Sequence, residues 1–490
     1  MFKPTIGLEI HSELNTKSKM FCCCKNNPEE KEPNINICPV CTGQPGALPI
    51  INREAVFKII KVGLALNCQI NKDSKFDRKN YFYPDLPKSY QISQYDIPFC
   101  QNGFLIIEKK KIRIQRIHLE EDAGKLIHLS DKKYSLIDFN RAGVPLMELV
   151  TEPDLSSGKE ARKFAQELQL ILRYLGVSKA DMEKGQLRVE VNISLSKDEN
   201  LGTKVEIKNL NSFRAVEKAI DYEIKRQTEI LKRGEKVVQE TRGWDDKREI
   251  TFSQRKKEEA QDYRYFPDPD LPTIHLDEEF IIKAKSEIPE LPAEKRERFK
   301  REFALEEKII EIFVVNKELG NYFEKVVSEL RNWVKEIEMK DNIKNDEFLR
   351  LAKLAANYLT TDLQKLLKED KKEGKELLIS PENFAEFITL IYKGKISSKI
   401  GKIVLEEMYK TGKDPSRIIE EKGLIQINNS SEIEDVVKKI IKENKKAVDD
   451  YKKGKENALQ FLIGQLMRET KGRVNPDIAR QSLEKILKDS

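Results

Sequence analysis

Two carboxylates and an imidazole lie on alternate residues near the start of the chain. Glu9, His11 and Glu13 alternate with apolar residues, and this period of two predicts a half-buried strand with the polar side chains on one face. Alternate side chains on a strand stand roughly 7 Å apart, so they could converge on one divalent cation. The plainer alternative is the solvated acidic face of an ordinary strand.

Two more acidic segments favour the metal hypothesis. Residues 118–125 include Glu120 and Glu121, and residues 138–153 include Glu148 on an apolar strand that follows a turn. Carboxylates from three segments would repel one another strongly in one place unless a cation held them there. The sequence therefore predicts a divalent-metal site assembled from residues that are distant along the chain.

Five cysteines lie close together after the first strand. Cys22, Cys23 and Cys24 are followed, after a loop, by Cys38 and Cys41. Two closely spaced thiol pairs across a loop are typical of a tetrahedral zinc site. We take Cys22 and Cys24 as the first pair because their side chains would point the same way in an extended segment, and Cys23 is the alternative ligand. Four thiolates leave no open position for substrate, so this zinc would be structural; reduced free cysteines are the other interpretation.

Residues 78–95 combine aromatic, basic and proline side chains. Two prolines in this run exclude a helix interior, so Lys79, Tyr81, Lys88 and Tyr90 are expected on irregular, rigid backbone of the kind that lines sites. Packing of the loop against itself is the alternative.

Several common catalytic motifs are absent from the sequence. It contains no G-x-x-x-x-G-K-[ST] phosphate loop and no G-x-G-x-x-G, so any nucleotide chemistry must depend on scattered carboxylates and cations. Only four histidines are present, and no Ser/His/Asp or Cys/His motif has a suitable local context. These absences argue against a self-contained amidase or protease.

The elements that must position these residues are mainly strands at first and helices later. Alternation predominates in the first 150 residues, whereas a 3.6-residue period predicts helices over 158–175 and 212–233. Short alternating runs predict strands over 186–195 and 203–208. The expected fold class is α+β: a β-rich cradle with packed helices, then an all-helical domain and a small helical tail domain.

Length and composition suggest about three domains in 490 residues. Prolines nearly vanish after residue 292, where Lys/Glu-rich helical periodicity begins, and a softer change follows near 401–412. We expect domains at 1–293, 294–405 and 406–490. No apolar run is long enough for a membrane span and no signal-peptide pattern precedes the first strand, so a cytoplasmic protein is expected.

The net charge of +6 is concentrated in the tail. Residues 438–490 contain 14 Lys/Arg and 8 Asp/Glu, which accounts for the whole excess. A local cationic region on an otherwise balanced chain favours a polyanion such as nucleic acid. A solvated lysine-rich helix face is the alternative.

Long composite motifs in a fixed order carry a resemblance to a known family. They lie at residues 7–11, 38–49, 78–94, 119–124, 140–154, 206–213 and 262–272, with a similar helical tail at 457–476. In these segments the chain resembles the B subunits of the tRNA-dependent amidotransferases, which act on Glu-tRNA(Gln) and Asp-tRNA(Asn). The resemblance implies that the chain uses ATP to phosphorylate the side-chain carboxylate of the misacylated tRNA. Ammonia, released from glutamine by a separate amidase A subunit, would then displace the phosphate; a small C subunit would complete a heterotrimer.

The resemblance also assigns expected roles to individual residues. Those expected around the magnesium are Glu9, His11, Glu121 and Glu148, with Glu120 beside them as a catalytic residue. Those expected along the ammonia path are Lys79, Tyr81 and Lys88. Those expected to contact the nucleotide are Lys204, Glu206, Lys208 and Asn209.

Two further groups complete the expected sites. The zinc-bearing branch of the family matches Cys22, Cys24, Cys38 and Cys41. The cations expected to contact tRNA are Lys453, Lys455, Arg468, Lys471 and Arg473. The alternative to an enzyme is a non-catalytic tRNA-binding scaffold within the same complex.

Overall fold

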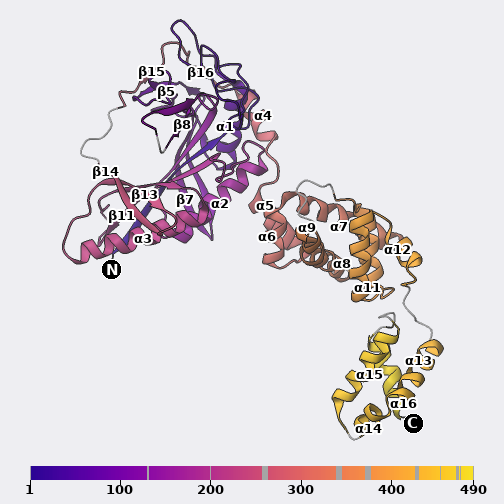
Figure 1. Cartoon of the computed structure of the whole chain (residues 1–490). Helices are drawn as coiled ribbons and strands as arrows, with labels where there is room; N and C mark the ends of the chain where they lie inside the picture. The colour runs from indigo at the N-terminus through magenta and orange to yellow at the C-terminus, as the bar shows by residue number, and fades with distance from the viewer. Residues whose placement is uncertain are drawn as a thin grey trace. The chain divides into compact units, whose positions relative to one another are not determined.

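The computed structural model describes residues 2–129, 132–198, 200–256, 263–337, 345–369, 377–424, 430–452, 454–470, 474 and 476–488. The chain forms two compact units, Met1–Pro292 and Ala293–Ser490 (Figure 1). The first combines sheets with helices and the second is helical, which confirms the predicted α+β class. In the described parts of the chain, every helix is too short or too polar to cross a bilayer.

A nine-stranded sheet forms the framework of the first unit. Its order is β14-β13-β12-β11-β1-β10-β7-β6-β2, so β1 (Lys3–Glu13) lies at the centre. The other strands are β2 (Gln69–Ile70), β6 (Cys100–Ile107), β7 (Lys110–Glu121), β10 (Pro145–Thr151), β11 (Leu187–Ser196), β12 (Val205–Leu210), β13 (Glu240–Asp245) and β14 (Ile250–Lys256). Neighbouring strands are antiparallel except β12 and β13, and β11 and β12 confirm the two strands predicted in that region.

Alternation along β1 gives the sheet two different faces. Ile6, Leu8 and Ile10 are fully or almost fully buried in the main hydrophobic core, as the period of two predicted. Glu9 and His11 therefore point to the opposite face. The same strand thus contributes to the core and to a polar surface.

Helices α1 (Arg53–Ala65), α2 (Gly158–Tyr174) and α3 (Phe213–Lys232) cover the apolar face of this sheet, and α4 (Glu278–Ser286) packs against α1. Helices α2 and α3 confirm the two predicted helices, and the Ser212 side chain caps α3 by accepting a hydrogen bond from the Ala215 amide. Gly158, the first residue of α2, is required by close packing, because a Cβ there would stand 2.5 Å from the Glu217 carbonyl oxygen of α3.

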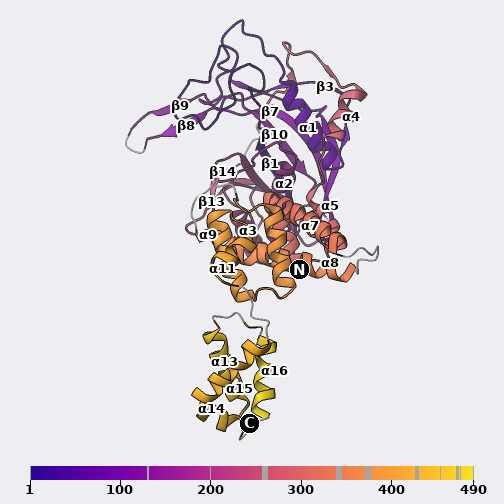
Figure 2. The same cartoon turned by 90° about the vertical axis from the view of Figure 1, so that its right-hand side faces the viewer.

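The first unit also contains three smaller sheets. They are β15-β4-β5, β16-β3 and β8-β9, with β3 (Asp73–Ser74), β4 (Asp77–Asn80), β5 (Tyr90–Ser93), β8 (Lys125–His128), β9 (Ser135–Asp138), β15 (Phe266–Pro267) and β16 (Ile274–His275). The expectation of irregular backbone was wrong for Lys79 and Tyr90, because β4 and β5 pair as antiparallel strands on either side of the proline-containing loop. Figure 2 shows the β8-β9 hairpin extending away from the large sheet.

The second unit consists of helices. Their bounds are α5 (Pro292–Phe303), α6 (Glu307–Val315), α7 (Lys317–Ile337), α8 (Asn345–Tyr358), the π-helical turn η1 (Leu359–Leu363), α9 (Gln364–Glu369), α10 (Pro381–Tyr392), α11 (Ser398–Thr411), α12 (Pro415–Glu421), α13 (Ser430–Glu443), α14 (Lys445–Lys452), α15 (Glu456–Glu469) and α16 (Pro476–Lys488). Buried residues of α13–α16, among them Val437, Leu462 and Leu483, form a core of their own. The finer division at residue 405 stays a prediction.

Candidate active site

A polar cavity of about 480 Å³ lies on the face of the large sheet that Glu9 and His11 share. Strands β1, β4, β7, β10, β11 and β12 supply most of its carboxylates and cations, and the segment around Tyr263 supplies aromatic rings. The cavity therefore collects residues from almost the whole length of the first unit.

Strand register explains how the distant acidic segments meet. His11 of β1 lies opposite Glu148 of β10, and Glu148 lies opposite His118 of β7. Directly paired residues on antiparallel strands have Cβ atoms about 5 Å apart on the same face. Glu120, two residues after His118, is on that face too and lines the cavity. Three neighbouring strands thus bring carboxylates and imidazoles into one cluster.

Glu148 lies between the two imidazoles. Its Oε2 atom is 3.4 Å from His11 Nε2 and 3.5 Å from His118 Nε2. His11 Nε2 also lies 3.6 Å from Glu120 Oε1 and 3.8 Å from Glu9 Oε1. The Glu120 and Glu148 side chains are almost completely buried, so their charges depend on these neighbours rather than on water.

The electrostatic state of the cluster follows from burial and mutual charge. Burial alone would lower the pKa of His11, but Glu148, Glu120 and Glu9 outweigh it and raise that pKa to about 9. Burial would raise the pKa of Glu148, yet His118, His11 and Lys79 hold it well below its usual range. Burial, with the adjacent Glu148 charge, raises the pKa of Glu9. The negative charge on Glu148 is therefore stabilised by the neighbouring histidines and Lys79.

The donor atoms fit a divalent cation. Glu9, His11 and Glu148 form one group whose ligand atoms all lie within 4.8 Å of one another, and His118, Glu120 and Glu148 form a second. Carboxylate oxygens suit magnesium and manganese, and imidazole nitrogen suits transition metals such as iron and zinc. The two groups share Glu148, so this residue is the common ligand of any ion held here.

Glu121 does not join the cluster, contrary to its expected place beside the magnesium. Its carboxylate accepts a hydrogen bond from the Ile92 amide and lies 2.6 Å from Lys88 Nζ. Both side chains line a separate cavity of about 60 Å³. Because successive side chains of a strand point to opposite faces, Glu120 reaches the main cavity and Glu121 cannot.

The residues expected along the ammonia path divide between these two cavities. Lys79 and Tyr81 line the main cavity, whereas Lys88 lines the small one. Burial would lower the pKa of Lys79, but Glu120 and Glu148 outweigh it and raise that pKa. Lys79 is therefore a permanent cation next to the carboxylate cluster.

Three of the four residues expected at the nucleotide line the main cavity. These are Lys204, Glu206 and Lys208, and Lys208 Nζ lies 2.8 Å from Glu190 Oε2. Asn209 does not, because the register between β11 and β12 shifts there and its backbone is left-handed, with φ 63°. Its side chain instead lines a separate groove at the start of α3.

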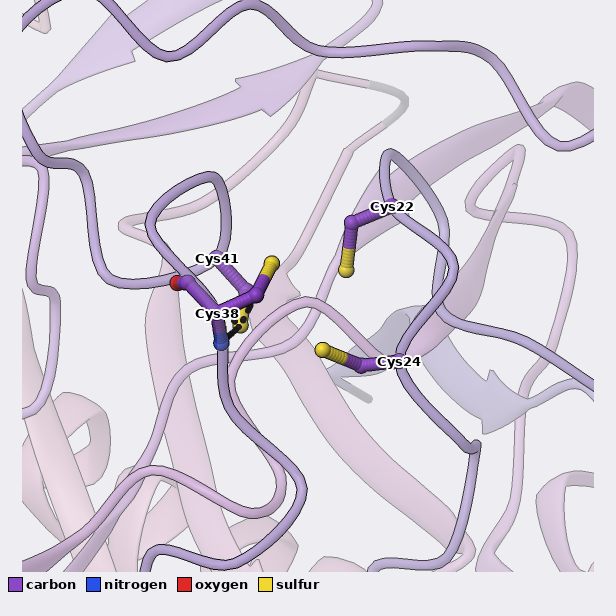
Figure 3. A group of neighbouring side chains, drawn as sticks. All are labelled: Cys22, Cys24, Cys38 and Cys41. Atoms are coloured by element: carbon purple, nitrogen blue, oxygen red, sulfur yellow. Dashed lines mark hydrogen bonds between the residues drawn. The ribbon is translucent and has the colours of Figure 1, made fainter.

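Four cysteine sulfur atoms meet beside the small cavity. Figure 3 shows the side chains of Cys22, Cys24, Cys38 and Cys41 pointing toward one centre, and their sulfur atoms all lie within 4.8 Å of one another. Cys23 is exposed and outside this group. A hydrogen bond from Cys22 lowers the pKa of Cys41 to about 5, and the nearby charge of Lys19 acts in the same direction. The hydrogen bond to Cys41 and burial raise the pKa of Cys22, and burial raises the pKa of Cys24. The group is suited to a metal by the convergence of its four sulfur atoms, which is the donor set of a tetrahedral site.

The expected tRNA-contacting cations are only partly described. Lys453, Lys471 and Arg473 lie outside the described residues. Lys455 is exposed and pairs with Asp450, with 3.0 Å between Nζ and Oδ1, and Arg468 is exposed near the end of α15.

Other residues of the main cavity were not assigned a role from the sequence. Arg116 Nη2 lies 3.4 Å from Glu148 Oε1, and Arg188, opposite His11 in the register, donates a 3.0 Å hydrogen bond from Nη2 to Asp122 Oδ2. His118 and Glu120 are two residues apart on β7 and therefore point to the same face. This alternation was the signal that could have identified His118. Glu13 was expected to converge with Glu9 and His11 on one cation, and this was wrong: it lies outside the cavity lining and belongs to neither group of possible metal ligands. It faces Asp122 and Arg188 instead, and burial and the Asp122 charge raise its pKa to about 7.

Comparisons with known proteins show which family the chain belongs to. A family model described as the GatB/GatE catalytic domain matches residues 4–282, and a second, described as the GatB domain, matches residues 340–487. The B subunit of the aspartyl/glutamyl-tRNA(Asn/Gln) amidotransferase from Thermotoga maritima is 50% identical over 496 residues, covering 99% of both chains. The B subunit of the same name from Caldicellulosiruptor saccharolyticus is 48% identical over 498 residues, covering 99% of this chain and 100% of its own. The chain therefore belongs to the GatB/GatE family, whose relatives here are B subunits of the aspartyl/glutamyl-tRNA(Asn/Gln) amidotransferases.

Proposed function

We propose that this chain activates and amidates the side-chain carboxylate of Glu-tRNA(Gln), Asp-tRNA(Asn) or both, using ATP. A carboxylate is a poor electrophile at neutral pH, so ammonia cannot displace its oxygen unless that oxygen is first converted into a leaving group. Phosphoryl transfer from ATP does this. The observation that carries the proposal is the cluster of Glu9, His11, Glu120 and Glu148 in one cavity with several cations.

The residues of the cluster have complementary roles in this reaction. Glu9, His11 and Glu148 would hold magnesium, with Glu120 and His118 beside them, and the ion when bound would supply charge neutralisation to the phosphates. Lys204 and Lys208, at the β12 side of the cavity, would bind phosphate oxygens of the nucleotide, and Glu206 would orient Lys208. Phosphoryl transfer needs little covalent help from protein, so positioning and electrostatics are the main contributions of the chain.

Ammonia would come from a partner. We infer an amidase A subunit and a small C subunit as partners in a cytoplasmic complex, because the relatives are named as B subunits of an amidotransferase. Lys79 and Tyr81 would line the end of the ammonia path in the main cavity. Lys88, in the small cavity beside the cysteines, would lie earlier on it.

The four-cysteine cluster is proposed as a structural zinc site. Its loop is rich in polar residues and buries little apolar surface, so a metal crosslink would contribute most of its stability. Gly43 of the same loop lies against Lys88, since a Cβ there would come within 2.5 Å of Lys88 Cγ. Zinc would therefore also keep the Lys88 side chain in place.

Reconstitution with the two partner subunits tests the function. The complex should convert Glu-tRNA(Gln) or Asp-tRNA(Asn) to the amide only when ATP, magnesium and glutamine are all present. Amide formation without ATP would refute the proposed activation step.

Metal affinity is expected to rise about tenfold per pH unit between pH 7 and pH 9. His11 in the metal-free protein is protonated up to a pKa of about 9, and a metal must displace that proton. The raised pKa of His11 also stabilises the folded, metal-free protein. This stabilisation is complete below about pH 6.5 and is lost as the pH rises through about 9. Calorimetric titration with Mn²⁺ in buffers of different ionisation enthalpy measures affinity and proton release together. His11→Asn should flatten the dependence, and an equally steep slope in that variant would contradict the assignment.

Deletion of residues 430–490, which contain α13–α16, should weaken tRNA binding at least about tenfold near 0.1 M salt. Lost phosphate contacts should also make the plot of log affinity against log salt shallower, by about one per contact. Filter binding over a salt series measures both, and an unchanged salt slope would remove the tail from the tRNA interface.

The scaffold alternative predicts instead that variants of the carboxylate residues in the cradle keep full amidation.

A further inference from the structure

Four tyrosines form one wall of the main cavity. Tyr81, Tyr95, Tyr263 and Tyr265 come from three separate segments, and all line the cavity that contains the carboxylate cluster. Tyr95 and Tyr265 are stacked, with ring centroids 4.3 Å apart and planes at 13°. Tyr263 contacts Tyr265 and Tyr81 edge to face, each at 6.0 Å. The rings thus form a continuous aromatic surface.

Hydrogen bonds to neighbouring strands hold this wall in place. The Asn80 amide donates a 2.8 Å hydrogen bond to the Tyr263 carbonyl oxygen, and Asn80 Nδ2 donates one of 2.9 Å to the Arg264 carbonyl oxygen. The Tyr95 amide donates a 3.0 Å hydrogen bond to the buried carboxylate of Asp77. Because the rings are positioned in advance, a ligand that stacks on them loses little binding energy to ordering.

The wall is not explained by hydrophobic burial. Tyr95 is 61% exposed, although it is a large ring on a structured segment. Lys79 Nζ lies 5.1 Å from the centroid of the Tyr263 ring, so the same wall carries a cation next to the carboxylate cluster. The accessible aromatic face therefore lies beside the charged groups proposed to bind phosphate and carboxylate. Such a surface suits a flat, heteroaromatic ligand attached to an anionic chain.

We propose that this wall is a stacking platform for an adenine ring, a role that rests on the proposed function. Two adenosines take part in that reaction: the one in ATP and the unpaired terminal adenosine that carries the amino acid on tRNA. Stacking on aromatic side chains recognises unpaired bases without requiring base-edge hydrogen bonds. Tyr95, as the most accessible ring of the wall, would make the first contact with the base.

Fluorescence of 2-aminopurine tests the platform, because stacking quenches it. One arm uses the full-length chain with tRNA whose terminal adenine is replaced by 2-aminopurine, and the other uses 2-aminopurine riboside triphosphate with Mg²⁺. Quenching in the first arm assigns the platform to tRNA, and quenching in the second assigns it to ATP. In the responding arm, Tyr95→Ala and Tyr265→Ala should remove most of the quenching and weaken affinity about tenfold, whereas Tyr95→Phe keeps the ring and should preserve both.

Tyr83→Ala is the matched control. Tyr83 is 62% exposed, close to the value for Tyr95, and does not line the cavity. Absence of quenching in both arms, or equal quenching by wild type and Tyr95→Ala, would overturn the platform. If the wild-type complex still forms amide in that case, the proposed function stands and only the platform fails. If the wild-type complex forms no amide, the proposed function itself fails.

Discussion

Glu148→Gln is expected to lower the rate of amide formation by about a thousandfold or more. This residue belongs to both groups of metal-ligand atoms, and its Oε2 lies within 3.5 Å of two imidazoles. An amide would keep the shape but remove the charge that makes the cluster attractive to a divalent ion. The measurement is single-turnover amidation by the reconstituted complex, together with glutaminase activity of the partner, which should remain.

Glu152→Gln is the control for that experiment. Glu152 follows the same strand β10, is only partly buried and does not line the cavity. It should retain the wild-type rate. If Glu148→Gln retains that rate as well, the carboxylate cluster does not take part in the chemistry.

Cys41→Ser is expected to remove bound zinc and to lower the unfolding midpoint of the first unit by roughly 10 °C. Cys41 is 3% exposed and lies within 4.8 Å of three other thiols, so its loss leaves the cluster one ligand short. Elemental analysis of protein purified without chelators, combined with calorimetry, measures both effects. Cys41 also lines the small cavity that contains Lys88. Amidation supported by the partner's ammonia should therefore fall too.

Cys23→Ser provides the comparison. Its side chain is exposed and lies outside the four-sulfur group, so zinc content and unfolding midpoint should stay at wild-type values. Loss of zinc from Cys23→Ser but not from Cys41→Ser would mean that the ligands have been assigned incorrectly.

The sequence predicted the central elements well because local periodicity determines them. The alternation of β1 and the helical period of α2 and α3 follow from which residues must be buried, and the structure buries those residues. Like charges on separate segments predicted that the acidic segments meet around a shared ligand, and the family resemblance supplied Glu9, His11 and Glu148 as the residues that do so.

The sequence did not show which of two neighbouring carboxylates faces the cavity. Glu120 and Glu121 are consecutive, and only the register of β7 against β10 decides which of them faces the cavity. Asn209 was misplaced for a related reason, because a shift in strand register and a left-handed backbone turn it away. Such irregularities depend on the partner strand, and residue types along one segment do not reveal them.

The tyrosine wall depended on contacts that are distant in sequence. Tyr95 and Tyr265 are separated by most of the first unit, yet they stack at 4.3 Å. Each segment alone is a short aromatic run that fits ordinary loop packing. The pairing of β15 with β4 brings them together, and strands of two to four residues leave almost no periodic signal.

Isotope transfer tests the central claim most directly. Glu-tRNA(Gln) labelled with ¹⁸O in both oxygens of the side-chain carboxylate is supplied to the reconstituted complex with ATP, magnesium and glutamine. If ATP phosphorylates that carboxylate, each amide formed should release one inorganic phosphate that contains one ¹⁸O atom. Unlabelled phosphate, or ¹⁸O recovered in AMP, would contradict phosphoryl activation in the carboxylate-lined cavity.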